Sequence, residues 1–275
     1  MKKLLIFLLG TAPILLGAAP SPRYISLAPA ATEILFALGL DKEVVGDSTY
    51  CNYPEQAKRV QKIGTFSDPN IEKIVSLKPD IIFTTGLEQA PSVTLLKRLG
   101  FRVIVSDPKN IRELYDSIKE IGRAVNKESQ ADSIVNRISG IILKIGEKVE
   151  KIPRAARLNV FIEIWHDPIM TAGPGSFVDE LINLAGAKNI AYDVPRPYSR
   201  FSAEKIIERD PDAVILCYMQ KQDAVRTVSR RLGWHNIKAV KNNRVIAGIN
   251  PDLILRPGPR IAQGLEEIYN NLYNE

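Results

Sequence analysis

Residues 72–83 read EKIVSLKPDIIF, and residues 204–215 read EKIIERDPDAVI. Each segment begins with the apolar spacing of a helix, turns at Pro-Asp, and ends in an apolar run typical of a buried strand. The same helix, turn and strand therefore occur once in each half of the chain. This internal repeat predicts two similar lobes.

Two further pairs of segments support the repeat. Glu33–Gly39 matches Glu180–Gly186, and each follows a strand-like run and a loop that contains proline. A weaker match joins Arg102–Val105 to Arg244–Ala247. Helices that alternate with short apolar strands are typical of parallel sheets with both faces covered. We therefore expect an α/β fold, with two similar lobes built on parallel sheets covered by helices.

A stretch of helical spacing with almost no proline separates the repeated units. Its isoleucines recur at the spacing of one helix face, and Glu128–Glu150 is predicted to form a single long helix. We expect an N-terminal lobe over residues 20–126, a connecting helix over 127–152 and a C-terminal lobe over 153–275. A stiff connector of this kind favours a largely pre-formed ligand cleft between the lobes.

The first nineteen residues have the pattern of a secretory signal peptide. Lys2 and Lys3 form a basic start, Leu4–Leu16 is an interrupted apolar run, and Gly17–Ala19 supplies small residues for cleavage. The run is too short for a comfortable transmembrane helix. No cysteine lies near the expected cut, so we expect no lipidation site and a free protein in the periplasm.

Composition and missing motifs narrow the chemistry. The 275 residues are 45% hydrophobic and 25% charged, as in globular proteins, and the net charge of +6 is spread among 31 acidic residues, which disfavours nucleic-acid binding. The chain has no Walker A, G-x-S-x-G, H-E-x-x-H or C-x-x-C motif, which disfavours the common hydrolases and phosphate-loop enzymes. It has only two histidines, so we expect no metal site. An exported nucleotide-handling enzyme that uses Gly173–Gly175 remains the alternative from another class.

Aromatic and charged residues gather in loops after predicted strands, where open α/β sheets bind ligands. Aromatic walls with a few charges suit a large, flat, partly apolar ligand. The candidates are Tyr50, Phe66, Trp165, Tyr198, Asp252 and Arg256. His166 and His235 are interpreted as ordinary structural residues, and Cys51 and Cys217 as two separate buried side chains, although an oxidising compartment would permit a disulfide.

Glu72 and Glu204 occupy matching positions in the first turns of the repeated helices. A glutamate there commonly just favours the helix dipole. Two equivalent carboxylates on two equivalent lobes would also suit a two-fold partner with two basic pockets.

Four segments carry a resemblance to a known family: RYISLAPAATE at 23–33, YCNYP at 50–54, NIEKIVSLKPD at 70–80 and RPGPRI at 256–261. The chain resembles the helical-backbone (class III) substrate-binding proteins of ABC importers, and is most similar to the members that bind the corrinoid vitamin B12 (cobalamin). The resemblance implies two lobes, a single connecting helix, a shallow cleft and little closure. It also implies a monomer with no enzyme activity and no cofactor, which delivers a small-molecule ligand to the permease of an ABC importer.

The resemblance assigns roles to particular residues. It places the corrin ring among aromatic and neighbouring side chains, with two charged residues on the polar edge. The matching ligand-binding positions are Pro29, Tyr50, Phe66, Trp165 and Tyr198, with Asp252 and Arg256 at the edge. Thr85 stands where some relatives have tryptophan, which reduces the stacking surface and leaves a related corrinoid, a ferric siderophore or haem as alternative cargo. Glu72 and Glu204 would engage arginines of the permease.

Overall fold

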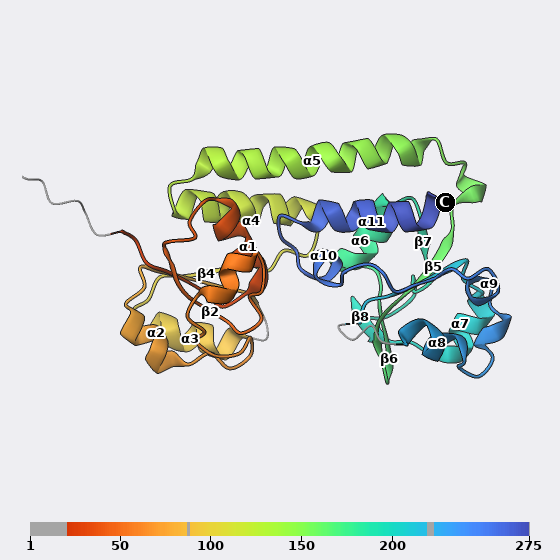
Figure 1. The fold of residues 1–275 in the computed structure, drawn as a ribbon, viewed down its shortest axis with the longest axis horizontal. Helices are drawn as coiled ribbons and strands as arrows, with labels where there is room; N and C mark the ends of the chain where they lie inside the picture. The colour runs from red at the N-terminus through yellow and green to blue at the C-terminus, as the bar shows by residue number, and fades with distance from the viewer. Residues whose placement is uncertain (1–20, 87–88, 219–222, 275) are drawn as a thin grey trace, which may run out of the picture.

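The apolar runs of the first half of the chain form a four-stranded parallel sheet (Figure 1). The computed structural model describes residues 21–86, 89–218 and 223–274, so the expected signal peptide at 1–19 lies outside the described residues. The sheet order is β2-β1-β3-β4. The strands are β1 (Tyr24–Ser26), β2 (Val44–Asp47), β3 (Ile81–Thr84) and β4 (Val103–Val105).

Alternate residues of these strands pack on opposite faces of the sheet. Phe83 joins the core beneath α1 (Pro29–Ala37) and α4 (Ile111–Ala124), whereas Ile82 packs with residues of α2 (Ile71–Leu77) and α3 (Ala90–Arg98). Both faces are therefore covered, as the near-continuous apolar strands predict.

The second lobe is built on a six-stranded sheet of order β10-β9-β5-β6-β8, with β7 paired to the start of β5. Its central strands are parallel, but β6 and β8 run antiparallel to their neighbours. Asp167 and Pro168 alone connect β5 to β6, and a connection this short can join only antiparallel strands. The strands are β5 (Asn159–His166), β6 (Ile169–Ala172), β7 (Lys188–Asn189), β8 (Tyr198–Arg200), β9 (Ala213–Leu216) and β10 (Val245–Ile246).

The sequence repeat is also a repeat of structure. Helix α2 and its counterpart α7 (Ala203–Arg209) are both seven residues long and both lead into a parallel strand. The side chains of Asn70 and Ser202 cap them by accepting from the third backbone N–H of each helix. Each ends at a left-handed residue, Lys78 with φ 46° and Asp210 with φ 42°. Helix α6 (Phe177–Leu184) likewise repeats α1.

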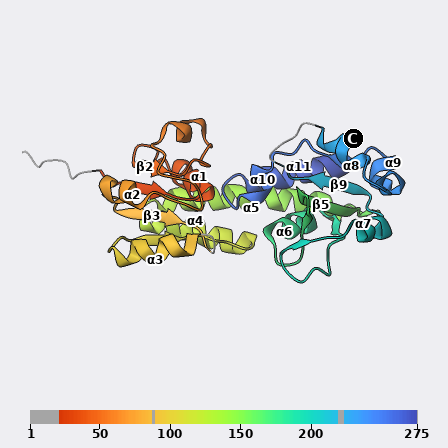
Figure 2. The ribbon, with the colours of Figure 1, turned by 90° about the horizontal axis from the view of Figure 1, so that it is seen from below.

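Helix α5 (Glu128–Glu150) spans both lobes and lies beside α4 and α11 (Ile261–Tyr273) (Figures 1 and 2). Its buried face, which includes Ile138 and Ile145, belongs to one cluster of buried side chains shared by the two lobes. The predicted helix at 128–150 is confirmed. No helix in the described ranges has the length and hydropathy of a membrane span. The remaining helices are α8 (Ala224–Ser229), α9 (Lys238–Lys241) and α10 (Asp252–Leu255), with short 3-10 turns at Glu55–Arg59, Arg154–Ala156 and Trp234–Asn236.

Candidate functional site

A cleft of about 660 Å³ lies between the two lobes. The first lobe contributes the start of α1 and the loops that follow β3 and β4, and the second contributes the start of α6, the loop before β8 and the segment after α10. The loops after β3 and β4 lie at the carboxyl ends of parallel strands, where α/β sheets commonly bind ligands. The cleft predicted between the lobes is therefore present.

The wall of the cleft is largely apolar. Pro29, at the first turn of α1, and Phe66 line it from the first lobe, and Pro197 and Tyr198 line it from the second. Tyr198 leaves 46% of its surface exposed, so its ring is available to a ligand. These side chains offer flat contact surface on both sides of the opening.

A buried glutamine holds the first-lobe wall together. The Gln89 Nε2 donates to the backbone oxygens of Leu27 at 2.9 Å and Phe66 at 2.7 Å, and its Oε1 accepts from the Thr85 N–H at 2.9 Å. One fully buried side chain thereby links the segments that follow β1 and β3 to the loop that carries Phe66. Gln89 was not predicted from the sequence, because two of its three partners, Leu27 and Phe66, are distant in the chain.

The polar side chains of the cleft are largely satisfied by one another. The Thr85 hydroxyl donates to Asp107 Oδ1 at 3.4 Å, and Lys109 Nζ lies 2.6 Å from Asp107 Oδ2. Partial burial, together with the nearby Asp107 carboxylate, raises the pKa of Tyr198, so its phenol stays protonated at neutral pH. Arg196 adds a further cation to the rim.

Arg256 lines the cleft and also connects the lobes. Its guanidinium donates to Asn52 Oδ1 at 2.7 Å and to the Tyr50 carbonyl oxygen at 3.4 Å, both in the first lobe. It also lies 3.0 Å from the Asp252 carboxylate and 3.6 Å from that of Glu33. Its charge is therefore largely neutralised within the protein.

The structure gathers some of the expected ligand residues and leaves others outside the cleft wall. Five of them line the cleft: Pro29, Phe66, Thr85, Tyr198 and Arg256. The remaining three, described next, are not among the residues that line it: Tyr50, Trp165 and Asp252.

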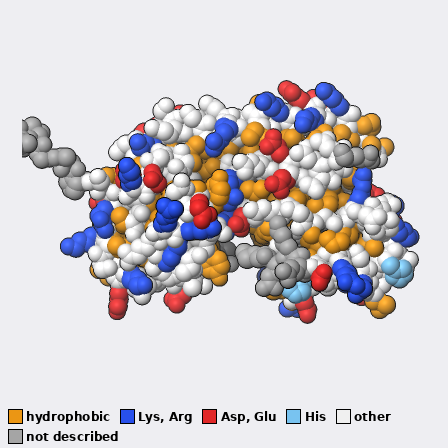
Figure 3. Space-filling model, in the orientation of Figure 1, with side chains coloured by type: hydrophobic (Ala, Val, Ile, Leu, Met, Phe, Trp, Pro, Cys, Tyr) orange, Lys and Arg blue, Asp and Glu red, His pale blue; other side chains and the backbone are white. Residues whose placement is uncertain are grey.

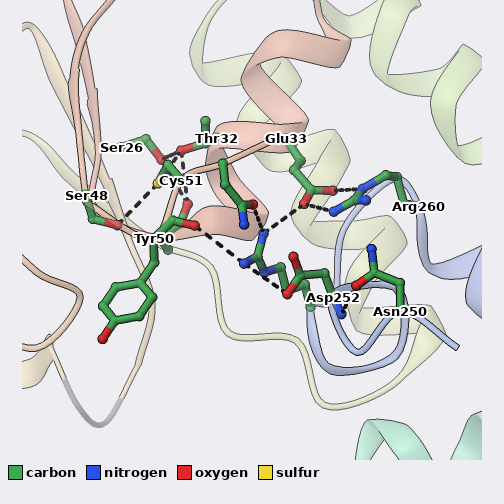
Figure 4. A network of polar contacts seen from close by, with 12 residues as sticks. Ser26, Thr32, Glu33, Ser48, Tyr50, Cys51, Asn250, Asp252 and Arg260 are labelled. Carbon is green, nitrogen blue, oxygen red and sulfur yellow. Dashed lines mark hydrogen bonds and ion pairs between the residues drawn. The ribbon is translucent and has the colours of Figure 1, made fainter. Parts of the chain in front are cut away.

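Each of these three side chains has a local explanation. The ring of Tyr50 points away from the charged network and is half exposed (Figure 4). The Trp165 indole lies at the end of β5, where its Nε1 donates to the Asp167 carbonyl oxygen and its ring packs beside His166. The Asp252 carboxylate forms an ion pair with the Arg256 guanidinium.

Three charged residues that line the cleft were not predicted from the sequence: Asp107, Lys109 and Arg196. Asp107 and Lys109 follow β4 directly, so their position at a strand's carboxyl end was the available signal. Arg196 lies in a loop without periodicity and offered no such signal.

Cys51 and Cys217 are unpaired and buried, as the sequence interpretation expects. Burial raises the pKa of both thiols, that of Cys217 to about 12. The Cys51 Sγ accepts from the Thr32 hydroxyl at 3.1 Å and does not line the cleft. Among the described residues, no group of three or more His, Cys, Asp or Glu side chains is placed to hold a metal ion.

Lysine and arginine are interspersed with acidic side chains on the face seen in Figure 3.

Residues 25–251 match the family model described as periplasmic binding protein. The chain belongs to the periplasmic binding protein family. Members of this family are substrate-binding proteins of ABC transporters and not enzymes, which confirms the resemblance inferred from sequence.

Three similar proteins illustrate the range of this family. The uncharacterised ABC transporter substrate-binding lipoprotein YvrC of Bacillus subtilis is 37% identical over 91% of this chain and 80% of its own. The vitamin B12-binding protein BtuF of Vibrio cholerae is 27% identical, covers 92% of this chain and 97% of its own, and superposes with a TM-score of 0.79. A Staphylococcus epidermidis solute-binding protein, with a suggested iron-binding role, is 33% identical over 92% and 98% of the two chains, with a TM-score of 0.79.

Proposed function

We propose that this substrate-binding protein captures a corrinoid, such as vitamin B12, in the cleft between its lobes and delivers it to an ABC importer. The observation that carries the proposal is the character of the cleft, where flat apolar side chains from both lobes share the wall with charged groups that mostly pair with other side chains. Similarity to the vitamin B12-binding protein of Vibrio cholerae supports the same cargo.

The charge balance favours a weakly charged ligand. Among the described residues, three cations line the cleft. Lys109 pairs with Asp107 and Arg256 pairs with Asp252, which leaves Arg196 as the one of these three best placed for an anionic group. An anionic ferric siderophore would require several cations to be redirected towards it. Corrinoids carry many amide groups, which exchange hydrogen bonds with side chains such as Thr85 and Tyr198 without needing a free charge.

Haem is the second candidate cargo, and Tyr198 is the observation that favours it. A tyrosine oxygen can bind haem iron as an axial ligand, and Tyr198 lies exposed in the cleft wall. The raised pKa of this phenol opposes the phenolate form that such a bond requires. We therefore place corrinoid ahead of haem.

Calorimetric titration of the purified protein tests the cargo directly. We expect saturable one-to-one binding of cyanocobalamin or cobinamide and no comparable heat with haemin or ferric siderophores. Binding of haemin with a Soret shift, or of a siderophore alone, would contradict the corrinoid proposal while leaving the transport role intact.

Replacing Tyr198 with alanine tests whether the cleft is the site. The change removes a flat contact surface, and we expect the Kd for cyanocobalamin to rise about 10-fold or more, in line with the loss of a buried aromatic contact. Tyr192→Ala is the matched control, because Tyr192 is 66% exposed and does not line the cleft. Equal effects of the two substitutions would argue against the cleft.

The permease is the expected partner, and we propose that Glu72 and Glu204 dock to it. Both glutamates are exposed, and each lies in the first turn of one of the equivalent helices α2 and α7. The two helices lie on different lobes (Figure 1). A permease with two equivalent subunits would meet one such carboxylate on each side.

We also propose export to the periplasm through the segment at 1–19, with no lipid anchor. The relative YvrC is a lipoprotein, so a lipid-anchored form is the alternative to a free protein. Mass spectrometry of the mature N-terminus in the native host distinguishes them, since a diacylglyceryl group would contradict the proposal.

A further inference from the structure

Two glutamates at matching positions of the sequence repeat each reach across to the opposite lobe. Glu33 lies in α1 of the first lobe, and Glu180 lies in α6 of the second, six residues before an equivalent glycine in each case. Glu33 contacts the start of α11, and Glu180 contacts the start of α4. Helices α4 and α11 both pack along α5 and follow corresponding strands of the two lobes.

The first contact is a buried, two-pronged ion pair (Figure 4). Arg260 Nε donates to Glu33 Oε2 at 2.8 Å, and its second nitrogen donates to Oε1 at 2.6 Å. The Arg260 guanidinium also stacks 3.7 Å from the ring centre of Tyr53 in the first lobe. Such paired, parallel hydrogen bonds fix both distance and orientation.

The second contact joins a carboxylate to a helix N-terminus. The Ile111 N–H, at the first position of α4, donates to Glu180 Oε2 at 2.8 Å. This N–H has no partner within its own helix, so the carboxylate from the other lobe satisfies it and opposes the positive end of the helix dipole. Burial raises the pKa of Glu180, while the bond from Ile111 acts in the opposite direction.

Both contacts lie directly behind the walls of the cleft. Pro29 at the start of α1 and Ser176 at the start of α6 line the cleft, so each glutamate belongs to a helix whose first turn forms a wall. Because the contacts are directional and join one lobe to the other, a change in the spacing of the lobes would have to break them.

We infer that Glu33 and Glu180 are positioning residues that form a matched pair of inter-lobe latches and hold the cleft at a fixed width. Cargo retention depends on this width, and that second part of the inference rests on the proposed function. Arg256 connects the first latch to the cleft, since it contacts Glu33 and also lines the cleft wall.

The test removes both latches without leaving a buried charge unpaired. Glu33→Met with Arg260→Met replaces the ion pair by apolar side chains of similar length, and Glu180→Met removes the acceptor for Ile111. Nitroxide labels at Lys97→Cys in α3 and Lys241→Cys in α9 report the distance between the lobes. The native cysteines are 1% and 2% exposed and should not compete for label.

We expect the inter-lobe distance distribution without cargo to become about twofold wider in the triple variant than in the labelled parent, as lobes held by fewer directional contacts rock further. We expect the dissociation rate of cyanocobalamin to rise about 10-fold, because fewer molecules hold the competent width. Restoring an acceptor oxygen with Glu180→Gln in place of Glu180→Met should recover much of the narrow distribution.

Glu120→Met with Glu208→Met is the matched control, since both glutamates are exposed, one on each lobe. An unchanged distance distribution in the triple variant would refute the proposal that Glu33 and Glu180 fix the spacing of the lobes, even if the variant were less stable to heat. A wider distribution with an unchanged dissociation rate would overturn their role in retention. The distance between the lobes is measured without cargo, so it tests the latches independently of the proposed function. Failure of cyanocobalamin to bind the parent protein would refute the proposed function and leave the distance result unaffected.

Discussion

Asp47 is a buried carboxylate whose surroundings satisfy it incompletely. Lys62 Nζ donates to Asp47 Oδ1 at 2.6 Å, whereas Oδ2 has no hydrogen-bond partner. The same ammonium donates to the carbonyl oxygens of Cys51 and Ala57, so it also fixes the loop that carries Tyr50. Burial outweighs the attraction of Lys62 and raises the pKa of Asp47 to about 7.

This raised pKa makes stability depend on pH. Between the ordinary pKa of 3.8 and about 7, the folded protein binds a proton that the unfolded chain releases, so the free energy of unfolding falls as the pH rises through this window. Asp47→Asn should flatten that dependence, and the parent should gain a few kcal/mol relative to the variant between pH 8 and pH 5. Urea unfolding at the two pH values measures the difference.

Asp41→Asn serves as the control for this comparison, because Asp41 is exposed on the same lobe. The free energies of unfolding of the parent and of Asp47→Asn are compared at pH 5 and at pH 8. If their difference is the same at both pH values, the assignment of this pH dependence to Asp47 is wrong.

At the residue scale, the sequence identified the apolar wall of the cleft better than its polar network. Pro29 lies in the quoted segment at 23–33, and Phe66 and Tyr198 are aromatic residues in loops after predicted strands. The hydrogen-bond partners of Arg256 in the first lobe, Tyr50 and Asn52, lie more than 200 residues away in sequence, and no local pattern reports such a contact. The role of Arg256 between the lobes was therefore visible only in the folded chain.

Helices α2 and α7 show why some element boundaries can be predicted from sequence. A capping side chain at each start and a left-handed residue before Pro-Asp at each end mark the limits locally. Their strongest functional feature is a pair of exposed carboxylates, Glu72 and Glu204, in equivalent first turns.

Charge reversal of both carboxylates should uncouple the protein from its transporter. With Glu72→Lys and Glu204→Lys together, the proposed arginines of the permease would meet like charges, which costs several kcal/mol at an interface. We expect stimulation of the transporter ATPase to be abolished while the Kd for cyanocobalamin changes less than about twofold, since neither residue lines the cleft.

Glu120→Lys with Glu208→Lys makes the same change in charge elsewhere, and Glu208 lies on the same helix as Glu204. The docking role of Glu72 and Glu204 would be contradicted if their double variant still stimulated the transporter ATPase normally. An equal loss of stimulation with the control pair would contradict it as well.

The antiparallel strands β6 and β8 were not predicted from the sequence. Apolar runs reveal that a strand exists, but its direction depends on the length of each connection and on which neighbour it meets. The internal repeat predicts only the elements that the two lobes share. The antiparallel strands β6 and β8 belong to the second sheet and have no counterpart in the four-stranded first sheet.

At the scale of the whole molecule, the two lobes share more than a cleft. One continuous cluster of buried side chains contains Phe83 of the first lobe and Phe177 of the second, joined through Ile138 and Ile145 of α5 and Leu265 of α11. The repeat and the long helix in the sequence predict two lobes and one connector. They do not reveal that α4, α5 and α11 form a common layer across both lobes.

A shared core has a thermodynamic consequence. Unfolding either lobe would expose the faces of α5 and α11 that the other lobe needs, so we expect the protein to melt as one cooperative unit despite its two sheets. Differential scanning calorimetry should show a single transition whose calorimetric and van't Hoff enthalpies agree. Two separable transitions would contradict this expectation. If the lobes do melt together, neither half of the chain is a folding unit on its own, and the duplicated architecture has become a single thermodynamic domain.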